Sequence, residues 1–315
     1  MNLRYLLRRL ATLILVLIGV SILSFAVVPL VPGSPARVRL GVQATPAAVA
    51  TLEAQLGLDK PLHRQYLTWI GGVLRGDFGE SLISSQNISA EVTRRLPATL
   101  QLAFAALAVG LLIAVPAGIS AALRPGSGRD VGVGIFSQLG VSVPDFWLGI
   151  LMITFFAETL DWLPSSGYVP LSQGLWPFLT HLALPAVAAG VTSGAIMTRF
   201  VRSAMLEVMS QDYVRTARAK GLHERVVVNR HALRNASISI ATIIGLQMAT
   251  LLSAVVVIEI IFSWPGLGSM ALNATLQRDY PVLQAALLLF AATFAIINLL
   301  TDLSYLLLDP SLEYT

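Results

Sequence analysis

The sequence predicts an all-α polytopic membrane protein with six transmembrane helices. Of its 315 residues, 55% are hydrophobic and only 12% are charged, about half the charged share of an average soluble protein. The mean hydropathy is +0.74, and the apolar residues gather into runs of the roughly 20 residues that a helix needs to cross a bilayer. The composition therefore excludes a water-soluble globule, and the runs lack the alternating polarity of membrane β-strands.

Six stretches nearly free of charged residues are the predicted spans, because each charge at the centre of a membrane helix costs roughly 2.5 to 3.5 kcal/mol. They cover residues 10–29, 96–123, 131–157, the later part of 162–200, 237–262 and 281–308. Asp145 is the only interruption of the third stretch. A long polar segment separates the first two spans, and a basic segment separates the fourth from the fifth.

The first stretch has an alternative interpretation as a cleavable signal peptide. Basic residues precede it, and Ser24, Phe25 and Ala26 offer a cleavage site of small residues around a larger one. Its apolar core continues through Leu30, which is longer than the usual core of a signal peptide. The length favours a retained transmembrane helix.

The distribution of basic residues predicts that both termini are cytoplasmic. With the N-terminus inside, the inner side carries thirteen of the 21 Lys and Arg residues and the outer side eight. Seven of those eight lie in the long outer segment, where the positive-inside bias is weak. The predicted organisation is a cytoplasmic N-terminus (1–9), a first transmembrane helix (10–31), an extracytoplasmic segment (32–97), a core with the other five helices (98–310) and a cytoplasmic tail (311–315).

The extracytoplasmic segment is predicted to fold into short helices. Thr45 and Pro46 form a helix start, and an apolar face continues to a stop at Gly57. A second amphipathic helix begins near Leu62 and continues to the glycine-rich residues 76–79. Two roles fit this segment: a docking rim for an external partner, or a lid packed on neighbouring helix ends.

The cytoplasmic loop over residues 203–236 carries the most specific local pattern. Between Arg199 and Arg234 the chain holds eight basic and three acidic residues, a net charge of +5 that exceeds the +4 of the whole chain. The remainder of the chain is therefore nearly neutral.

A short helix over residues 213–220 is predicted within this loop. Asp212 is in the position to cap it, and Gly221 can end it in a left-handed conformation. Tyr213 and Ala217 form a small apolar stripe on it. Such a helix suits insertion into a groove of another protein, but a positive-inside loop lying on anionic headgroups has the same composition.

The stretch 212–222, followed by residues 231–236, resembles the coupling loop of permease subunits of bacterial ATP-binding-cassette importers. The similarity is to the dipeptide, oligopeptide and nickel branch of that family. Further blocks resemble the branch in the same order along the chain: 32–35, 56–62, 76–81, 95–102, 259–268, 278–284, 298–303 and 309–310. Ser34 and Ser311 depart from the family pattern, since an aspartate and an arginine are expected there.

The resemblance implies a type I importer permease fold and a set of partners. These partners are a second homologous permease, two cytosolic ATPases that bind the ATP and magnesium, an extracytoplasmic substrate-binding protein and the lipid bilayer of the bacterial cell membrane. Peptide is the expected cargo rather than nickel, because the spans hold no cysteine and no evident histidine site. The resemblance assigns contact with the ATPases to Asp212, Tyr213, Arg215, Thr216, Ala217, Arg218, Lys220, Gly221, Leu222 and His231.

Polar residues within the spans are candidates for lining the transport pathway, because they need a partner or water to be tolerated in a bilayer. The candidates are Asp145, Gln101, Gln138 and Glu259. Asp145 follows Pro144, so its carboxylate can cap a restarted helix instead. The alternative for Glu259 is a structural hydrogen bond into the following turn at Trp264. The alternative for the two glutamines is a role in helix packing.

The sequence offers no chemistry of its own for catalysis. It has no cysteine, and a phosphate-binding loop needs Gly-Lys, whereas Lys60 follows Asp59 and Lys220 follows Ala219. The scattered histidines predict no metal site, and the basic excess bears on topology rather than on nucleic acid. An importer subunit without enzymatic activity is therefore expected. The two alternatives are an ion-driven secondary transporter that uses Asp145 and an intramembrane enzyme, for which paired catalytic groups are missing.

Overall fold

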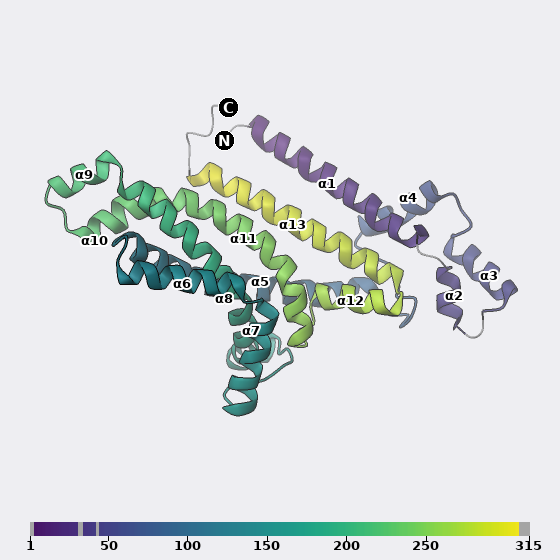
Figure 1. The fold of residues 1–315 in the computed structure, drawn as a ribbon. Coiled ribbons are helices and arrows are strands. Elements are labelled where there is room, and N and C mark those ends of the chain that lie inside the picture. The colour runs from purple at the N-terminus through teal and green to yellow at the C-terminus, as the bar shows by residue number, and fades with distance from the viewer. Residues whose placement is uncertain (1–2, 31–33, 42–43, 309–315) are drawn as a thin grey trace. The chain divides into compact units, whose positions relative to one another are not determined.

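The computed structural model describes residues 3–30, 34–41 and 44–308. This part of the chain is almost entirely helical (Figure 1), and its only β pairing is an isolated bridge between Glu80 and Asn87. The family-like residues Pro32 and Gly33, the block 309–310 and the tail 311–315 lie outside the described residues.

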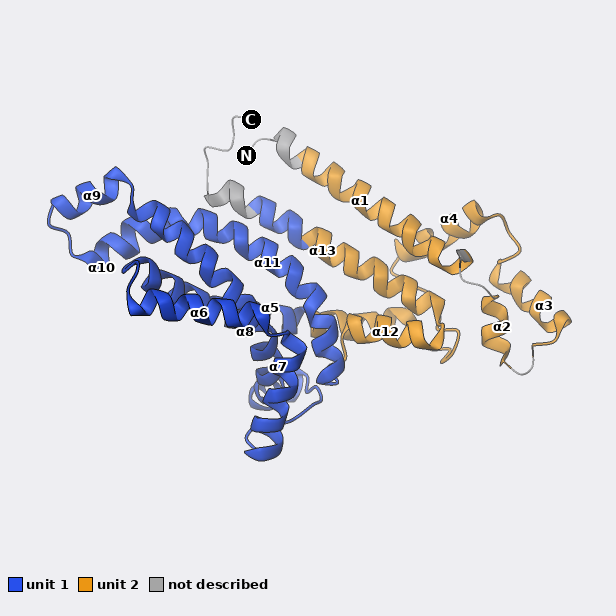
Figure 2. Ribbon diagram, viewed as in Figure 1, with its two compact units in different colours: residues 1–6, 100–264, 297–315 blue, residues 7–99, 265–296 orange. Residues whose placement is uncertain are grey.

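The chain divides into two compact units (Figure 2), each described by itself. Unit 1 comprises residues 1–6, 100–264 and 297–315, and unit 2 comprises residues 7–99 and 265–296. The helices α5 and α13 each begin in unit 2 and end in unit 1. The elements in chain order are α1 (Leu3–Leu30), α2 (Pro35–Leu40), α3 (Pro46–Leu56), α4 (Leu62–Val73), α5 (Ile88–Ala122), α6 (Gly128–Ser142), α7 (Asp145–Met152), the π-helix η2 (Ile153–Thr159), the 3-10 helix η3 (Leu171–Gln173), α8 (Leu175–Met209), α9 (Asp212–Ala219), α10 (Glu224–Val226), the π-helix η4 (Val227–Ala232), α11 (Leu233–Ile261), α12 (Leu267–Gln277) and α13 (Tyr280–Leu308).

Within the described residues, five helices are long and apolar enough to cross a membrane. They are Leu7–Pro29, Ile88–Ala122, Leu175–Met209, Glu224–Ile261 and Tyr280–Leu303. A sixth span results if α6 and the α7–η2 pair count as one broken crossing. The prediction of an all-helical protein with six spans is thus confirmed, with the third span as its irregular member.

The third span is broken at Pro144, after which the sequence indicated that the helix can restart. Its two parts, Gly128–Ser142 and Asp145–Thr159, are bent by 96°. Val143 is extended, with φ −91° and ψ 120°, because the ring of Pro144 disfavours a helical conformation in the residue before it. The helix restarts at Asp145, so the break follows directly from the proline.

The second span begins earlier than predicted, at Ile88 rather than near Leu96. The side chain of Asn87 accepts a hydrogen bond from the N–H of Ala90 at 3.1 Å, which satisfies a free donor at the helix start. Glu91 lies in the first turn, where a negative charge suits the helix dipole. Part of the predicted extracytoplasmic segment therefore belongs to α5.

The two predicted helices of the extracytoplasmic segment are present as α3 and α4 in unit 2. The Thr45 hydroxyl accepts from the N–H of Ala48 at 3.3 Å, and Gly57 ends α3 with φ +68°. Unit 2 also has an apolar core where the start of α5, α12 and the start of α13 meet. Its buried residues are Ile88, Val92, Leu267, Met270, Ala285 and Ala286.

Unit 1 is organised around α8, which contacts α6, α7 and α11. Small residues let α5 approach α8 closely as well. A Cβ added to Gly190 would lie 2.7 Å from the carbonyl oxygen of Ala106 and 2.7 Å from the Cβ of Val109. Close backbone packing through small residues is the usual way that membrane helices associate. The helices α9 and α10 connect the ends of α8 and α11 (Figure 1).

Candidate functional site

The short helix α9 rests on its own chain through one apolar face. Val214 and Ala217 are buried and form a cluster with the buried Val227 of η4. Val208 and Met209 at the end of α8 pack against this cluster. Since Val214 and Ala217 are three residues apart, they lie on the same side of the helix. The cluster fixes α9 on the ends of the two long elements that flank it.

Two predictions for this helix are wrong. Asp212 does not cap it, because the helix begins one residue earlier than expected and Gln211 occupies the cap position without a side-chain hydrogen bond. The carboxylate of Asp212 instead lies 3.4 Å from Arg215. The predicted apolar stripe of Tyr213 and Ala217 is not one surface, because Ala217 is buried against its own chain, whereas Tyr213 is 41% exposed and its hydroxyl accepts a hydrogen bond from the amide of Asn235 at 2.7 Å. Val214 takes the place assigned to Tyr213.

The predicted end of the helix is confirmed. Gly221 has φ +76°, a left-handed conformation that residues with a Cβ rarely adopt. Its N–H donates to the carbonyl of Arg218 at 2.9 Å, and the N–H of Leu222 donates to the carbonyl of Ala217. These bonds satisfy carbonyls that the helix end would leave free.

An ion pair braces α9 against α10. The guanidinium of Arg218 donates two hydrogen bonds to the carboxylate of Glu224, at 3.1 and 2.7 Å. This pairing raises the pKa of Arg218 above its ordinary value. Together with the bond between Tyr213 and Asn235, it ties α9 to the elements that follow it. Two parallel bonds to one carboxylate give the contact a defined geometry.

The other faces of α9 are open to solvent in this chain. Of the ten residues assigned to ATPase contact, eight are exposed: Asp212, Tyr213, Arg215, Thr216, Arg218, Lys220, Gly221 and Leu222. His231 is half-buried, and Ala217 is buried against its own chain. The exposed face combines basic side chains with apolar ones, since Leu222 is 40% exposed. This charged helix surface is suited to bind another protein, because the opposite face of α9 is packed on its own chain.

Two of the pathway candidates belong to one cluster in unit 1. The hydroxyl of Tyr168 donates to the side-chain oxygen of Gln101 at 3.2 Å. The ring of Tyr168 packs edge-on against Trp264, with centroids 4.7 Å apart. The N–H of Trp264 in turn donates to the carbonyl of Glu259 at 2.7 Å. Glu259 is fully buried, but this bond to the turn is made by its backbone carbonyl, so the role of its carboxylate stays a prediction.

The other two pathway candidates lie at the broken third span. Asp145 is half-buried, and its carboxylate accepts from the N–H of Phe146 at 2.9 Å, at the first turn of the restarted helix. The contact is local but it is not the predicted cap, because Pro144 occupies the cap position of this helix and no side-chain hydrogen bond caps it. Gln138 is exposed on α6. In the described chain the bonds of these two residues are local: Asp145 accepts from Phe146, and the backbone carbonyl of Gln138 accepts from the hydroxyl of Ser142.

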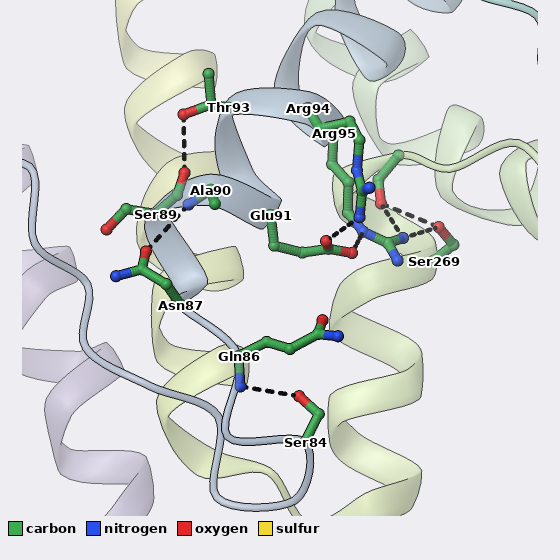
Figure 3. A network of polar contacts seen from close by, with 11 residues as sticks. Ser84, Gln86, Asn87, Ser89, Ala90, Glu91, Thr93, Arg94, Arg95 and Ser269 are labelled. Carbon is green, nitrogen blue, oxygen red and sulfur yellow. Dashed lines mark hydrogen bonds and ion pairs between the residues drawn. The ribbon is translucent and has the colours of Figure 1, made fainter.

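A polar network at the start of α5 was not predicted from the sequence (Figure 3). Glu91 pairs with both Arg94 and Arg95. Arg95 also donates to the hydroxyl of Ser269 at 3.3 Å and to the carbonyl of Gly266 at 3.4 Å. The spacing of Glu91, Arg94 and Arg95 was visible in the sequence, but nothing there indicated the partners on α12. The network joins α5 and α12 within unit 2.

A second polar contact in unit 2 holds the loop before α5. Asp279 is 4% exposed, and its carboxylate accepts hydrogen bonds from the hydroxyl of Ser81 and from the N–H of Leu82. Among the described residues, no group of three or more His, Asp and Glu side chains is arranged to hold a metal ion. The contacts of Asp279 hold the loop before α5 to the residue that precedes α13.

Multiple spanning helices, one of them broken, and an exposed helix fixed on a loop between two spans define a subunit of a membrane transporter. The chain belongs to the family of binding-protein-dependent transport system inner membrane components. The model of this family matches residues 114–314, and the model of its N-terminal part matches residues 2–103. The chain is accordingly a multi-pass inner-membrane permease component of an ABC importer and not an enzyme.

Similar proteins agree with this assignment along nearly the whole chain. A probable peptide ABC transporter permease protein of Sinorhizobium fredii, y4tP, is 40% identical over 98% of this chain and 99% of its own length. The di/tripeptide transport system permease protein DppB of Pseudomonas aeruginosa is 41% identical over 99% of both chains. The oligopeptide transport system permease protein AppB of Bacillus subtilis is 37% identical over 98% of this chain and 99% of its own length.

A solved structure shares the fold. A chain of the methionine ABC transporter MetNI, in an inward-facing conformation, has a TM-score of 0.57 and 20% identity to this chain, and the match covers 70% of this chain and 96% of that one. At this identity the similarity concerns the fold alone. It agrees with the type I importer permease fold that the sequence predicted.

Proposed function

We propose that this chain is the translocation subunit of an ATP-driven importer of di- or oligopeptides. It forms the pathway with a second homologous permease and receives peptide from an extracytoplasmic binding protein. Two cytosolic ATPases bind α9 and drive the conformational change of this chain. Both termini lie in the cytoplasm. The peptide cargo is supported by relatives of about 40% identity over their full length that are named as peptide permeases.

The observation that carries the coupling role is the way α9 is held. Its apolar face is anchored by Val214 and Ala217, and the bonds of Tyr213 and Arg218 fix it laterally. A force applied to the exposed face is therefore transmitted to α8 and α11, rather than being absorbed by a loose loop. Closure of the ATPases can then switch the spans between two arrangements as rigid bodies.

The test is peptide uptake by proteoliposomes that contain this chain, the second permease, the ATPases and the binding protein. We expect uptake of a labelled dipeptide that depends on ATP and stops when the ATPases are left out. Arg215→Glu reverses a charge on the exposed face and should abolish most of this uptake. Arg124→Glu reverses an exposed charge in the loop between α5 and α6 and should leave most of it intact.

Two outcomes would contradict the proposal. Uptake by this chain alone along an ion gradient would identify a secondary transporter instead. Equal loss of uptake in the Arg215 and Arg124 variants would show that general charge in the cytoplasmic loops, and not α9, sets the coupling.

A further inference from the structure

The helix α4 lies beside the membrane-spanning part of α1 and not beyond its end. The hydroxyls of Ser21 and Tyr66 are 2.7 Å apart, and the rings of Phe25 and Tyr66 pack edge-on with centroids 5.5 Å apart. Ser21 and Phe25 precede Pro29, the end of the apolar span, by eight and four residues. At 1.5 Å per residue they lie about 12 and 6 Å inside that end. The contact face of α4 is therefore at the depth of a lipid leaflet.

The composition of α4 fits this depth. None of its residues is buried in the chain, and Leu62 and Leu67 are 56% and 62% exposed. Its aromatic residues Tyr66 and Trp69 face α1 at Phe25. Amphipathic helices of this kind lie in the boundary layer of a membrane, and Tyr and Trp are enriched there. Lipid is therefore the neighbour expected for the exposed leucines.

A cavity of about 790 Å³ opens beside this helix within unit 2. One part of its wall is apolar and comes from the spans and from α4: Phe25, Val28, Trp69 and Tyr280. Phe25 and Val28 lie within the span of α1. The apolar wall is therefore next to the hydrocarbon of the bilayer, and a chain leaving the cavity on this side would enter the leaflet directly.

The other part of the wall is charged and comes from the extracytoplasmic segment. It carries two cations, Arg39 and Lys60, and two anions, Glu53 and Glu80. Arg39 and Glu80 are 3.8 Å apart, with 31% and 60% of their side chains exposed. A pair so long and so accessible to water holds its partners weakly. Lys60 and Glu80 are exposed. Glu53 is half-buried and accepts a hydrogen bond from the Ser34 hydroxyl, but a carboxylate can accept further bonds, so cationic and anionic groups are both available to a ligand.

We infer that this cavity binds one zwitterionic phospholipid of the adjoining leaflet, of the phosphatidylethanolamine class. Its phosphate lies at Arg39 and Lys60, its ammonium group donates hydrogen bonds to Glu53 and Glu80, and its acyl chains leave along Phe25. The balance of two positive and two negative groups selects a headgroup without net charge. A primary ammonium can donate bonds to carboxylates, which a quaternary one cannot. The site needs only the bilayer around α1, so it is independent of transport.

The full-length chain in mild detergent is titrated with dioleoylphosphatidylethanolamine and, separately, with dioleoylphosphatidylglycerol, and bound lipid is counted by native mass spectrometry. We expect one phosphatidylethanolamine per chain, bound at least about tenfold more tightly than phosphatidylglycerol. Lys60→Glu should weaken its binding about tenfold, as the loss of one charge-assisted hydrogen bond implies. Glu80→Lys should reverse the preference toward phosphatidylglycerol. Both side chains are exposed, so neither change threatens folding.

The matched control is Arg64→Glu, which reverses a charge on α4 outside the cavity lining and should leave binding unchanged. The inference is overturned if the chain retains no lipid, or if the two lipids bind equally. It is also overturned if Arg64→Glu weakens binding as much as Lys60→Glu. Displacement of the lipid by the dipeptide alanylalanine would identify a peptide site instead. The lipid-binding experiment does not measure ATP-driven uptake, so failure of the lipid inference and failure of the proposed transport function can be distinguished.

Discussion

Truncating the residue that anchors α9 gives a direct test of how firmly this helix is held. Val214 is fully buried in the cluster with Ala217 and Val227. Val214→Ala removes two carbon groups worth about 0.8 kcal/mol each, about 1.6 kcal/mol together. The helix propensity of alanine exceeds that of valine by about half a kcal/mol, which offsets part of this cost. The net cost is about 1 kcal/mol, which raises the open fraction of α9 about fivefold.

Amide hydrogen exchange measures this opening. In the Val214→Ala variant the amides of Lys220 and Gly221, which bond to the carbonyls of Thr216 and Arg218, should exchange about fivefold faster. The amides in the middle of α8 should be unaffected. Thr216→Ala is the control, because it makes a similar gain in helix propensity at an exposed position without removing a buried group. Unchanged exchange in Val214→Ala, or equal acceleration in both variants, would refute the anchoring role.

Two further predictions concern packing and depth. Gly190→Ala should destabilise the chain by about 1 to 3 kcal/mol and lower its melting temperature in detergent, because the added Cβ meets the backbone of α5. The control is Gly134→Ala, which has open space around it and should be neutral or stabilising. Similar melting temperatures of the two variants would contradict the close packing of α5 and α8. The depth of α4 is tested with a spin label on Leu67→Cys in proteoliposomes, since the chain has no native cysteine that would also be labelled. The label should be accessible to oxygen and shielded from a water-soluble nickel complex. Greater accessibility to the nickel complex than to oxygen would place α4 outside the leaflet.

Local features were predictable from the sequence because neighbouring residues determine them. Thr45, Pro46 and Gly57 mark the bounds of α3, and Gly221 ends α9, through contacts within a few residues. The apolar runs gave the spans for the same reason. Pro144 marked a disturbance in the third span, but its neighbours along the chain do not set the angle between the two parts.

Contacts between distant segments could not be predicted in this way. Arg95 and Ser269 are 174 residues apart, and the tyrosine bonded to Gln101 is 67 residues away. Which partners meet is decided by the packing of whole helices. The difference at Tyr213 has the same kind of cause: the side of α9 that is buried is the one that packs on Val227, Val208 and Met209, and Val214 rather than Tyr213 lies on that side.

The most direct test of the coupling claim uses a single cysteine on the exposed face of α9. Thr216→Cys is labelled with a water-soluble maleimide, with Arg124→Cys as a second cytoplasmic position, in the chain alone and in the complex with its ATPases. The account predicts rapid labelling of both positions in the chain alone and at least about tenfold slower labelling of position 216 in the complex, with position 124 less affected. Equal labelling of position 216 with and without the ATPases would contradict it.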